Sequence, residues 1–482
     1  MTFELRVATF SAVRAPKKTT IRLNRPALCS FLACAATNLI AADPAGPEME
    51  SPQAPSQPQA LAASTNQPAS ETSEQNWNWH AQNTDIFQFH PSFPAKYSGP
   101  NSLHSHPEAN ETVSLDLLVG RRLWEGAEAH VDGLMWQGFG FSKTLGIEGF
   151  PNAEAFRLGT DVPNVNFTRA FLRQTIGLGG EQETVEDDDL NLAGKRDISR
   201  LTLTVGRFSA KDMFDGNSYA NDPRAQFMNW AFAANEAWDY PADSIGFTTG
   251  LAMELNQPQW SLRYGFFQVP RNSNGTAQDQ AYTRAWAMAT EFEHRHTING
   301  HPGAIRLLAY LNHAHMGSYA AVADNPAFNG DITLTRDYRS KFGVCLNAEQ
   351  ELTKGVGAFL RAGWSDGRNE AWMYSDVDHT ASLGLSIQGA FWNRTNDTLG
   401  IAGAINSASR VHQQFLAVGG TGILAGDGAL SYNFEELTEA YYDIQIWKTI
   451  HASVDYQFVS HPAFNRDRGP VHVFGLRLHW TL

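Results

Sequence analysis

The end of the chain, Val471 to Leu482, alternates strictly between apolar and polar side chains. In an extended strand, side chains point to opposite faces with a period of two. One face then carries Phe474, Leu476, Leu478, Trp480 and Leu482, and the other carries Gly475, Arg477, His479 and Thr481. Such a strand fits poorly into a globular core, but it suits a wall between lipid and a wet lumen. The pattern therefore predicts the strand at which an outer-membrane barrel closes.

Four further stretches alternate in the same way, at residues 111–123, 259–268, 355–365 and 449–459. The mean hydropathy of −0.34 is too polar for a helical membrane protein. It fits a barrel, because lipid-facing and lumen-facing residues cancel in any average. A soluble β-sandwich shows the same alternation, so the prediction also rests on the turns and on the N-terminal segment.

The gaps between alternating stretches are of two kinds, which take turns along the chain. Short gaps lie at 125–126, 256–258, 352–354, 393–397 and 448–449, and long ones at 90–110, 140–165, 208–243, 270–281, 316–337, 366–378, 409–433 and 460–469. We therefore predict an all-β fold, a single transmembrane antiparallel up-and-down β-barrel of about sixteen strands and of the outer-membrane porin type, with both ends periplasmic. The turn 180–197 is too long for this rule, and we expect its acidic run, 186–189, to be solvated.

The N-terminal segment predicts export. Residues 1–42 combine a basic region with a short Ala-rich apolar run, which is typical of a secretory signal peptide. Residues 43–76 are rich in Pro, Ala and Ser and predict a disordered periplasmic tether before a porin domain at 77–482. The expected location is the bacterial outer membrane, in contact with its lipid. A net charge of −14 argues against any affinity for nucleic acid.

Arginines recur on the polar faces of the predicted strands, and we expect them to line the lumen. They are Arg122, Arg169, Arg173, Arg200, Arg263, Arg306, Arg361 and Arg477. Guanidinium groups can donate paired hydrogen bonds to neighbouring sugar hydroxyls, and carboxylates can accept from them. The alternative is that Arg–carboxylate pairs only brace the wall. Arg477 is expected to lie below any narrowing of the lumen.

The long gap at 208–243 is unusually aromatic for an external loop, with Trp230, Trp238 and Tyr240 near Asp239 and Arg224. We expect this segment to fold into the barrel and narrow it. Aromatic faces could then stack on the apolar face of a sugar ring. The alternative is a packed cap over the mouth of the barrel.

Three long stretches resemble the OprB-type carbohydrate-selective porins. Residues 169–183 read RAFLRQTIGLGGEQE, residues 221–244 read NDPRAQFMNWAFAANEAWDYPADS, and residues 455–479 read DYQFVSHPAFNRDRGPVHVFGLRLH. The resemblance implies an outer-membrane channel of about sixteen strands for glucose or related sugars, narrowed by inward-folded loops. Carried over by motif, it favours Arg169, Arg173, Arg224, Trp230, Trp238, Asp239 and Tyr240 as residues of the narrowing, and the inner-face pattern adds Arg200.

The same resemblance implies an outer wall that assembly machinery recognises through the last strand. Leu482 departs from the Phe with which such barrels usually end, which weakens that signal. The oligomeric state stays open, with a homotrimer as one option. General diffusion without sugar selectivity and a secreted sugar-binding β protein remain alternative functions.

Enzymatic and metal chemistry find little support in the sequence. We find no convincing set of catalytic residues for an outer-membrane lipase, and no phosphate loop or zinc-protease motif. The pairs His313 and His315, and His104 and His106, lack a third ligand at metal spacing. We therefore expect no catalytic residue, no metal and no cofactor.

Overall fold

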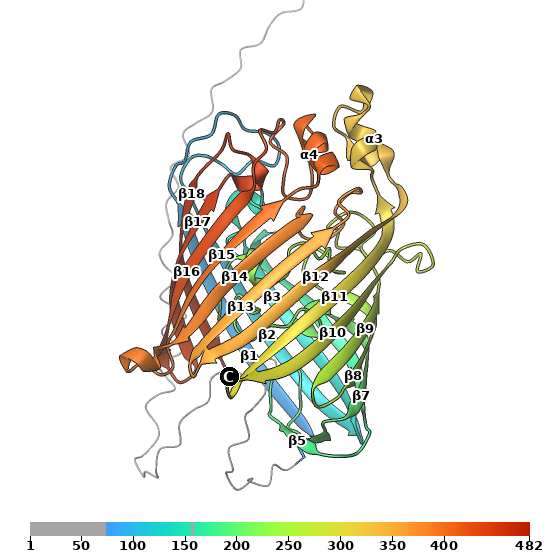
Figure 1. The fold of residues 1–482 in the computed structure, drawn as a ribbon, viewed down its shortest axis with the longest axis vertical. Helices are drawn as coiled ribbons and strands as arrows, with labels where there is room; N and C mark the ends of the chain where they lie inside the picture. Colours follow the sequence, from blue (N-terminus) through green and yellow to red (C-terminus); the bar gives the residue numbers. More distant parts are fainter. Residues whose placement is uncertain (1–73, 156–158) are drawn as a thin grey trace, which may run out of the picture. The chain divides into compact units, whose positions relative to one another are not determined.

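The computed structural model describes residues 74–155 and 159–482. Within them, sixteen strands form one closed antiparallel barrel with the order β1-β18-β17-β16-β15-β14-β13-β12-β11-β10-β9-β8-β7-β4-β3-β2 (Figure 1). This confirms the predicted barrel and its number of strands. The predicted signal peptide at 1–42 lies outside the described residues, as does all of the predicted tether except 74–76.

The sixteen wall strands are β1 (Trp77–His90), β2 (Glu108–Trp124), β3 (Ala127–Gly138), β4 (Thr160–Gly177), β7 (Arg200–Phe208), β8 (Thr248–Asn256), β9 (Trp260–Phe267), β10 (Trp286–Ile298), β11 (His301–Met316), β12 (Asp337–Thr353), β13 (Val356–Ser365), β14 (His379–Gln388), β15 (Thr398–Ser407), β16 (Glu435–Trp447), β17 (Ile450–Ser460) and β18 (Val471–Thr481). Two short strands, β5 (Gln182–Val185) and β6 (Gly194–Asp197), pair with each other in a separate sheet.

Helical turns occur only in connections between strands of the described chain. They are η1 (Phe141–Lys143), η2 (Ala210–Asp212), α2 (Trp230–Ala233), α3 (Tyr319–Ala323), η3 (Pro326–Phe328), η4 (Ile332–Thr335), η5 (Gly389–Trp392), α4 (Arg410–Ala417) and η6 (Pro462–Phe464). None of the helices in the described residues has the length and apolar character needed to cross a membrane.

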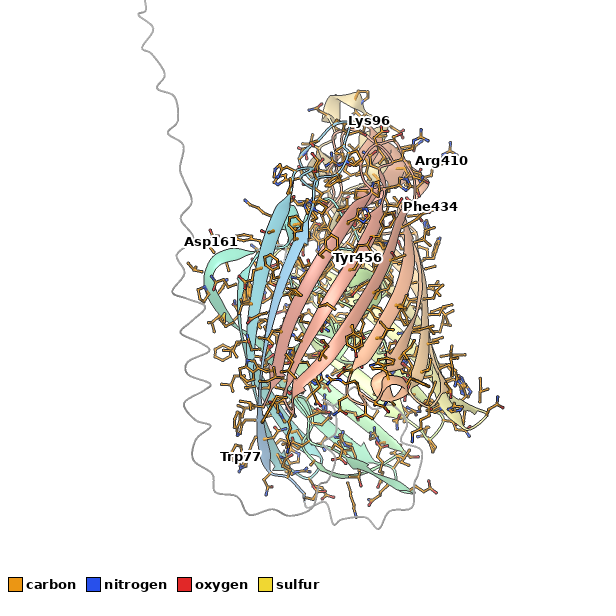
Figure 2. The ribbon with its side chains drawn as sticks, turned by 90° about the vertical axis from the view of Figure 1, so that its left-hand side faces the viewer. Trp77, Lys96, Asp161, Arg410, Phe434 and Tyr456 are labelled. Atoms are coloured by element: carbon orange, nitrogen blue, oxygen red, sulfur yellow. The ribbon has the colours of Figure 1, made fainter. Side chains whose placement is uncertain are left out.

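The closing strand β18 lies between β17 and β1, in register from Phe89 opposite Phe474 to Gln82 opposite Thr481. Its alternation follows the predicted faces, because Leu476 is 55% exposed on the outside and Arg477 is 2% exposed on the inside. Tyr456 points outward from the neighbouring wall (Figure 2). The outer wall is therefore apolar and the inner wall polar, as lipid and a wet lumen require.

Turns at the two ends of the barrel differ in length. One end has tight connections, such as 125–126 and 448–449, and the other has long ones that carry α3 and α4 (Figure 1). A further tight turn joins β10 to β11, where Asn299 and Gly300 both have positive φ, 53° and 85°. Two left-handed residues give the type I′ geometry that matches the twist of a hairpin, and an Asn-Gly pair adopts it at little cost.

The exceptional turn, residues 178–199, lies at the end of the barrel that has the tight turns and folds as the β5–β6 hairpin. Glu186 and Asp187 of its acidic run are exposed, as expected, whereas Asp188 and Asp189 are half-buried. Asp187 accepts hydrogen bonds from Asn78 at 2.7 Å and from Gln75 at 3.1 Å. Asp188 accepts from the Leu190 amide at 2.8 Å, within the hairpin. The hairpin is thus bonded to the inner side of β1 and to the residues before it.

Candidate functional site

The connection between β7 and β8, residues 209–247, leaves the wall and binds to its inner side. Arg361 of β13, fully buried, holds this segment most extensively. Its Nη1 donates to the carbonyl oxygens of Ala220 and Phe232, both at 2.7 Å, and its Nε donates to Asp215 Oδ1 at 3.1 Å. A buried guanidinium is stable only when its donors are satisfied, so Arg361 fixes two turns of the segment to one strand.

Other inner-wall side chains bind the same segment from further around the barrel. Glu439 of β16 accepts from the backbone amides of Met228 at 2.6 Å and Asn229 at 3.0 Å. Arg477 of β18 donates to the carbonyls of Pro223 at 2.8 Å and Gln226 at 2.7 Å. Arg477 therefore anchors the inward segment, which corrects the expectation that it lies below the narrowing.

Local signals in the sequence shape the segment between these anchors. Ser209 and Asp212 form a capping box around η2, in which each side chain binds the other residue's backbone amide. Asn229 caps α2 by accepting from the Ala231 amide at 2.9 Å. These caps satisfy amide groups that a short helical turn would otherwise leave unpaired inside the barrel.

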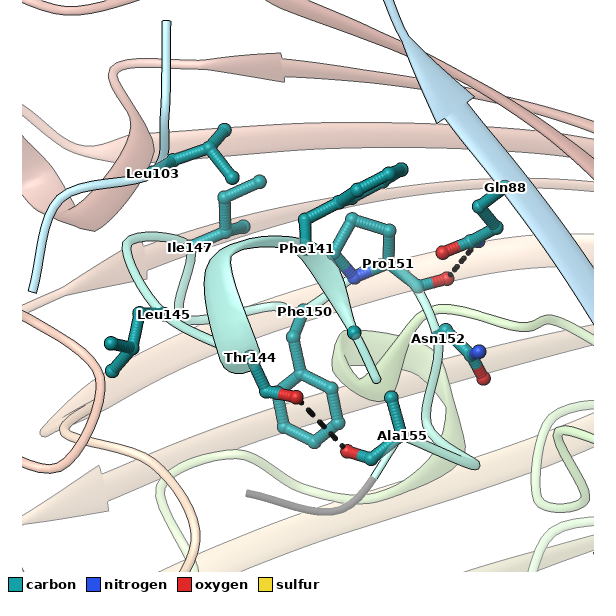
Figure 3. A pocket seen from close by; sticks show the side chains of 11 residues that line it. Gln88, Leu103, Phe141, Thr144, Leu145, Ile147, Phe150, Pro151, Asn152 and Ala155 are labelled. Atoms are coloured by element: carbon teal, nitrogen blue, oxygen red, sulfur yellow. Dashed lines mark hydrogen bonds between the residues drawn. The ribbon is translucent and has the colours of Figure 1, made fainter. Parts of the chain in front are cut away.

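Residues 139–155, which follow β3, also fold inward, although the sequence did not predict this. The Pro151 carbonyl accepts from Gln88 of β1 at 2.8 Å and from Gln457 of β17 at 2.9 Å. The cavity left beside it has a volume of about 10 Å³, the space of a single water molecule (Figure 3). The two inward segments meet where the Trp230 amide donates to the Phe150 carbonyl at 3.1 Å.

Arginines and carboxylates converge between these segments and strands β2 to β4. We call Asp116, Asp132, Glu154, Arg169, Asp212 and Arg224 the arginine–carboxylate cluster. Arg169 binds Asp132 at 2.7 Å and forms a two-point pair with Asp212 at 2.8 and 2.9 Å. Arg224 binds Asp116 at 2.5 Å and Glu154 at 3.0 Å. The Arg169 and Arg224 side chains are 17% and 15% exposed, so both remain partly accessible.

The electrostatics of this cluster follow from its pairing. Burial acts to lower the pKa of the Arg224 guanidinium, but Asp116 and Glu154 outweigh it and raise that pKa above its ordinary value. The cluster also joins elements that are far apart in sequence, because Asp212 and Arg224 come from one inward segment and Glu154 from the other. It therefore ties both segments to β2, β3 and β4.

The predicted aromatic residues form a second cluster, packed against each other and against the other loops. The Trp230 ring stacks on Phe150 at 5.5 Å and on Tyr374 at 5.0 Å, and Tyr374 also stacks on Tyr240 at 4.8 Å. Trp238 contacts the Tyr240 ring at 5.5 Å. These rings support the inward segment from within.

Burial limits what the aromatic cluster can contact directly. Trp230, Trp238 and Tyr240 are 7%, 3% and 3% exposed, so little of any ring faces the lumen. Asp239 is equally buried, and its carboxylate accepts from the backbone amides of Trp372 and Met373. The structure thus brings these four predicted residues together, but as a scaffold and away from the partly exposed arginines.

Two buried carboxyl groups lie in the same loops without an opposing cation. Burial, together with Asp376 and Glu435, raises the pKa of the Glu148 carboxyl well above its ordinary value. Burial and Glu435 do the same for the pKa of Glu236. Neither forms an ion pair within the described residues, so burial disfavours the charged form of both.

Arg173 and Arg200 line a cavity of about 400 Å³ that lies below the inward segment and beside the β5–β6 hairpin. Arg173 donates to the Leu190 carbonyl at 2.7 Å, and Arg200 binds Glu183 at 2.7 Å. Both acceptors belong to the hairpin, which sequence periodicity could not place. The length of this turn was nevertheless a usable signal, because a long connection at the end of the barrel with tight turns must pack against another part of the protein.

The predicted site residues therefore divide into three places: Arg169 and Arg224 in the arginine–carboxylate cluster, Arg173 and Arg200 at the cavity, and Trp230, Trp238, Asp239 and Tyr240 in the scaffold. Glu154, Phe150 and Asp212 lie among these residues but were not predicted from the sequence. The apolar composition of 139–155 was the available signal. No group of three or more His, Cys, Asp or Glu within the described residues is arranged to hold a metal ion.

Comparisons with known proteins agree with this architecture. Residues 101–482 match the family described as "OprB: Carbohydrate-selective porin, OprB family". The solved structure of Pseudomonas putida OprB is similar, with 17% sequence identity, coverage of 84% of this chain and 94% of that chain, and a TM-score of 0.65. The outer membrane channel DcaP of Acinetobacter baumannii has 10% identity, coverage of 84% and 97%, and a TM-score of 0.46. No curated protein sequence matches the chain.

Proposed function

Because the family match covers most of the chain, this protein belongs to the OprB family of carbohydrate-selective porins, and from that premise we propose that it admits sugars selectively. Family and closed barrel together make it a channel of the bacterial outer membrane, not an enzyme. The proposal concerns which solutes pass through the channel. Glucose or a related small sugar would diffuse passively down its gradient between the inward segments and the wall.

The arginine–carboxylate cluster is the observation that carries this proposal. It presents guanidinium donors and carboxylate acceptors side by side, on side chains that are between 1% and 17% exposed. Every sugar hydroxyl both donates and accepts, so a ring of hydroxyls can bond to such an alternating surface at several points. Contacts of this kind are individually weak, which allows release on the far side.

The aromatic scaffold and the wall contacts hold the arginine–carboxylate cluster in a fixed geometry. Arg224 and Asp212 sit on a segment held by Arg361, Glu439 and the stacked rings, so their positions relative to β2 and β4 are fixed. Preorganised polar groups lose little freedom when a solute passes. The aromatic residues are therefore proposed to act through the shape of the narrowing, and Arg169 and Arg224 through direct contact.

Liposome swelling tests the proposal. Glucose should enter several times faster than a neutral non-sugar solute of similar size, such as a short ethylene glycol oligomer. Equal rates would refute sugar selectivity and favour the alternative, a general diffusion porin.

A matched pair of variants locates the selectivity. Arg224→Gln should reduce the preference for glucose, because it removes one guanidinium from the cluster. Arg122→Gln is the control, since Arg122 lies in β2 next to the tight turn and binds Glu74 at 2.6 Å, away from the cluster. A loss of preference in both variants, or in neither, would remove the cluster from the sugar path.

A further inference from the structure

Below the narrowing lies the cavity of about 400 Å³ that we call the exit vestibule. Its walls come from β4, β7 to β11, the start of the inward segment and the β5–β6 hairpin. A cavity of this volume lies within the range of pockets that hold small ligands. Seven cationic side chains and five carboxylates line it, and it differs from the arginine–carboxylate cluster in how the cations are paired.

Some vestibule arginines are neutralised. Arg263 binds Glu254 at 2.6 Å, Arg306 binds Glu293 at 2.8 Å, and Arg295 also reaches Glu293, at 2.9 Å. These pairs form one network along β8 to β11. They leave little positive charge on that side of the cavity.

Arg173 and Arg196 are not neutralised in this way. Within the described residues, neither has a carboxylate oxygen within 4.0 Å. Both instead donate to one neutral oxygen, Asn191 Oδ1, at 3.1 and 3.2 Å. Two guanidinium groups thus converge on a single amide, and Arg200 lies close enough to influence Arg196 electrostatically.

The proximity of Arg173 and Arg200 affects the pKa of Arg196. Burial, together with Arg173 and Arg200, lowers the pKa of Arg196 to about 10, although Glu128 and Glu183 act in the opposite direction. Like charges held this close repel each other unless an anion joins them. The natural complement is a carboxylate or phosphate group, which accepts two parallel hydrogen bonds from a guanidinium.

We propose that the exit vestibule binds the anionic group of an acidic sugar, a carboxylate or a phosphate, through Arg173 and Arg196. Neighbouring polar groups that line the same cavity, Asn217, Asn221 and Thr204, would meet the hydroxyls. The channel would then favour sugar acids or sugar phosphates over neutral sugars at its exit. This inference rests on the proposed sugar function and narrows its substrate class.

Single-channel conductance with added solutes as blockers tests the inference on the full-length protein in planar bilayers. The probes are glucose, glucuronate, glucose 6-phosphate, acetate and inorganic phosphate. Glucuronate or glucose 6-phosphate should block at concentrations about tenfold below glucose, and acetate and inorganic phosphate should block weakly. The two acidic sugars distinguish a carboxylate from a phosphate as the preferred anion.

Variants assign the effect to the vestibule. Arg173→Gln and Arg196→Gln should each reduce the acidic-sugar preference about threefold or more while leaving block by glucose unchanged. Lys195→Gln is the matched control, because it removes the same charge from the adjacent, exposed position of β6 outside the cavity lining. An unchanged preference in both arginine variants would overturn the proposal.

The remaining outcomes are also decisive. Glucose block equal to glucuronate and glucose 6-phosphate block would refute the anionic subsite while leaving the sugar channel intact. Acetate or inorganic phosphate blocking as strongly as the acidic sugars would show a general anion site and overturn the assignment to sugars. Absence of block by every sugar would instead refute the proposed function itself.

Discussion

The arginine–carboxylate cluster and the exit vestibule use the same side chain in opposite ways. In the cluster, Arg169 and Arg224 have four carboxylates around them at 2.5 to 3.0 Å. In the vestibule, Arg173 and Arg196 share one amide oxygen and have no carboxylate within 4.0 Å in the described chain. Arg169 and Arg173 are only four residues apart on β4, so pairing, and not position along the strand, separates the two regions.

This difference distinguishes charges that hold the structure together from charges that stay free to bind a solute. A paired, partly buried guanidinium holds its carboxylates in place, and its removal leaves them unpaired where water is scarce. A guanidinium without a carboxylate contributes little to stability, but it keeps its field and its donors for a solute. Mutation of the cluster should therefore lower stability as well as sugar selectivity, whereas mutation of the vestibule should change selectivity with little loss of stability.

The largest expected effect is the loss of stability in Arg169→Gln. The change leaves Asp132, 1% exposed, and Asp212, 11% exposed, without their cation. Breaking a buried pair in this way costs roughly 3 kcal/mol or more. The free energy of unfolding in lipid vesicles, from urea titration, measures it.

Arg173→Gln is the comparison four residues away on the same strand. It removes two hydrogen bonds to the hairpin but no ion pair, so the loss should stay near 1 kcal/mol. Equal losses in Arg169→Gln and Arg173→Gln would show that pairing does not distinguish the two regions.

A smaller effect of opposite sign is expected for Arg196→Gln. Its charged form is disfavoured in the folded protein by burial and by Arg173 and Arg200. Removing that charge should raise the free energy of unfolding slightly, by less than about 1 kcal/mol, because the lost hydrogen bond to Asn191 partly offsets the relief of burial and repulsion. Lys195→Gln should change it less. A clear destabilisation by Arg196→Gln would mean that an unrecognised partner neutralises this arginine.

Sequence periodicity predicted the strands of the barrel wall, but it did not predict which groups bind the arginines on the inner face. Alternation placed Leu476 outside and Arg477 inside, because a strand between two solvents has only two faces. The same rule pointed Arg169 and Arg173 inward. It could not predict that Asp212 pairs with Arg169 or that the Leu190 carbonyl accepts from Arg173. Both acceptors lie in loops, where the sequence has no periodic pattern.

The aromatic segment shows the same limit. Its composition predicted that Trp238 would not lie in free solvent, and the ring is 3% exposed. Composition could not say whether such a ring faces a solute or packs against Tyr240, since both place it out of water. The inward course of residues 139–155 was not predicted, because an apolar composition by itself does not distinguish an inward loop from a packed external one.

The smallest expected effect is a pH step at Lys211, which lines the vestibule from the inward segment. Burial and the nearby Arg361 lower the pKa of Lys211 to about 8, against an ordinary value of 10.5. Above pH 8 the vestibule therefore loses one positive charge, and the preference for anions over cations should fall between pH 7 and pH 9. The unfolded chain binds the proton more tightly than the folded one in this range, so stability should rise slightly as pH increases from about 8 to 10.5.

Reversal potentials in a salt gradient across planar bilayers measure this step. Lys211→Met should show the lower anion preference at every pH and no step near pH 8, whereas Lys195→Met, exposed outside the cavity, should keep the step. Among the vestibule arginines, Arg196 has a pKa lowered to about 10, still above the step expected at Lys211, so Arg196→Gln recorded over the same pH range separates the two groups. If the step persisted in Lys211→Met, the titrating group would lie outside the vestibule, and the vestibule charge would come from Arg173 and Arg196 alone.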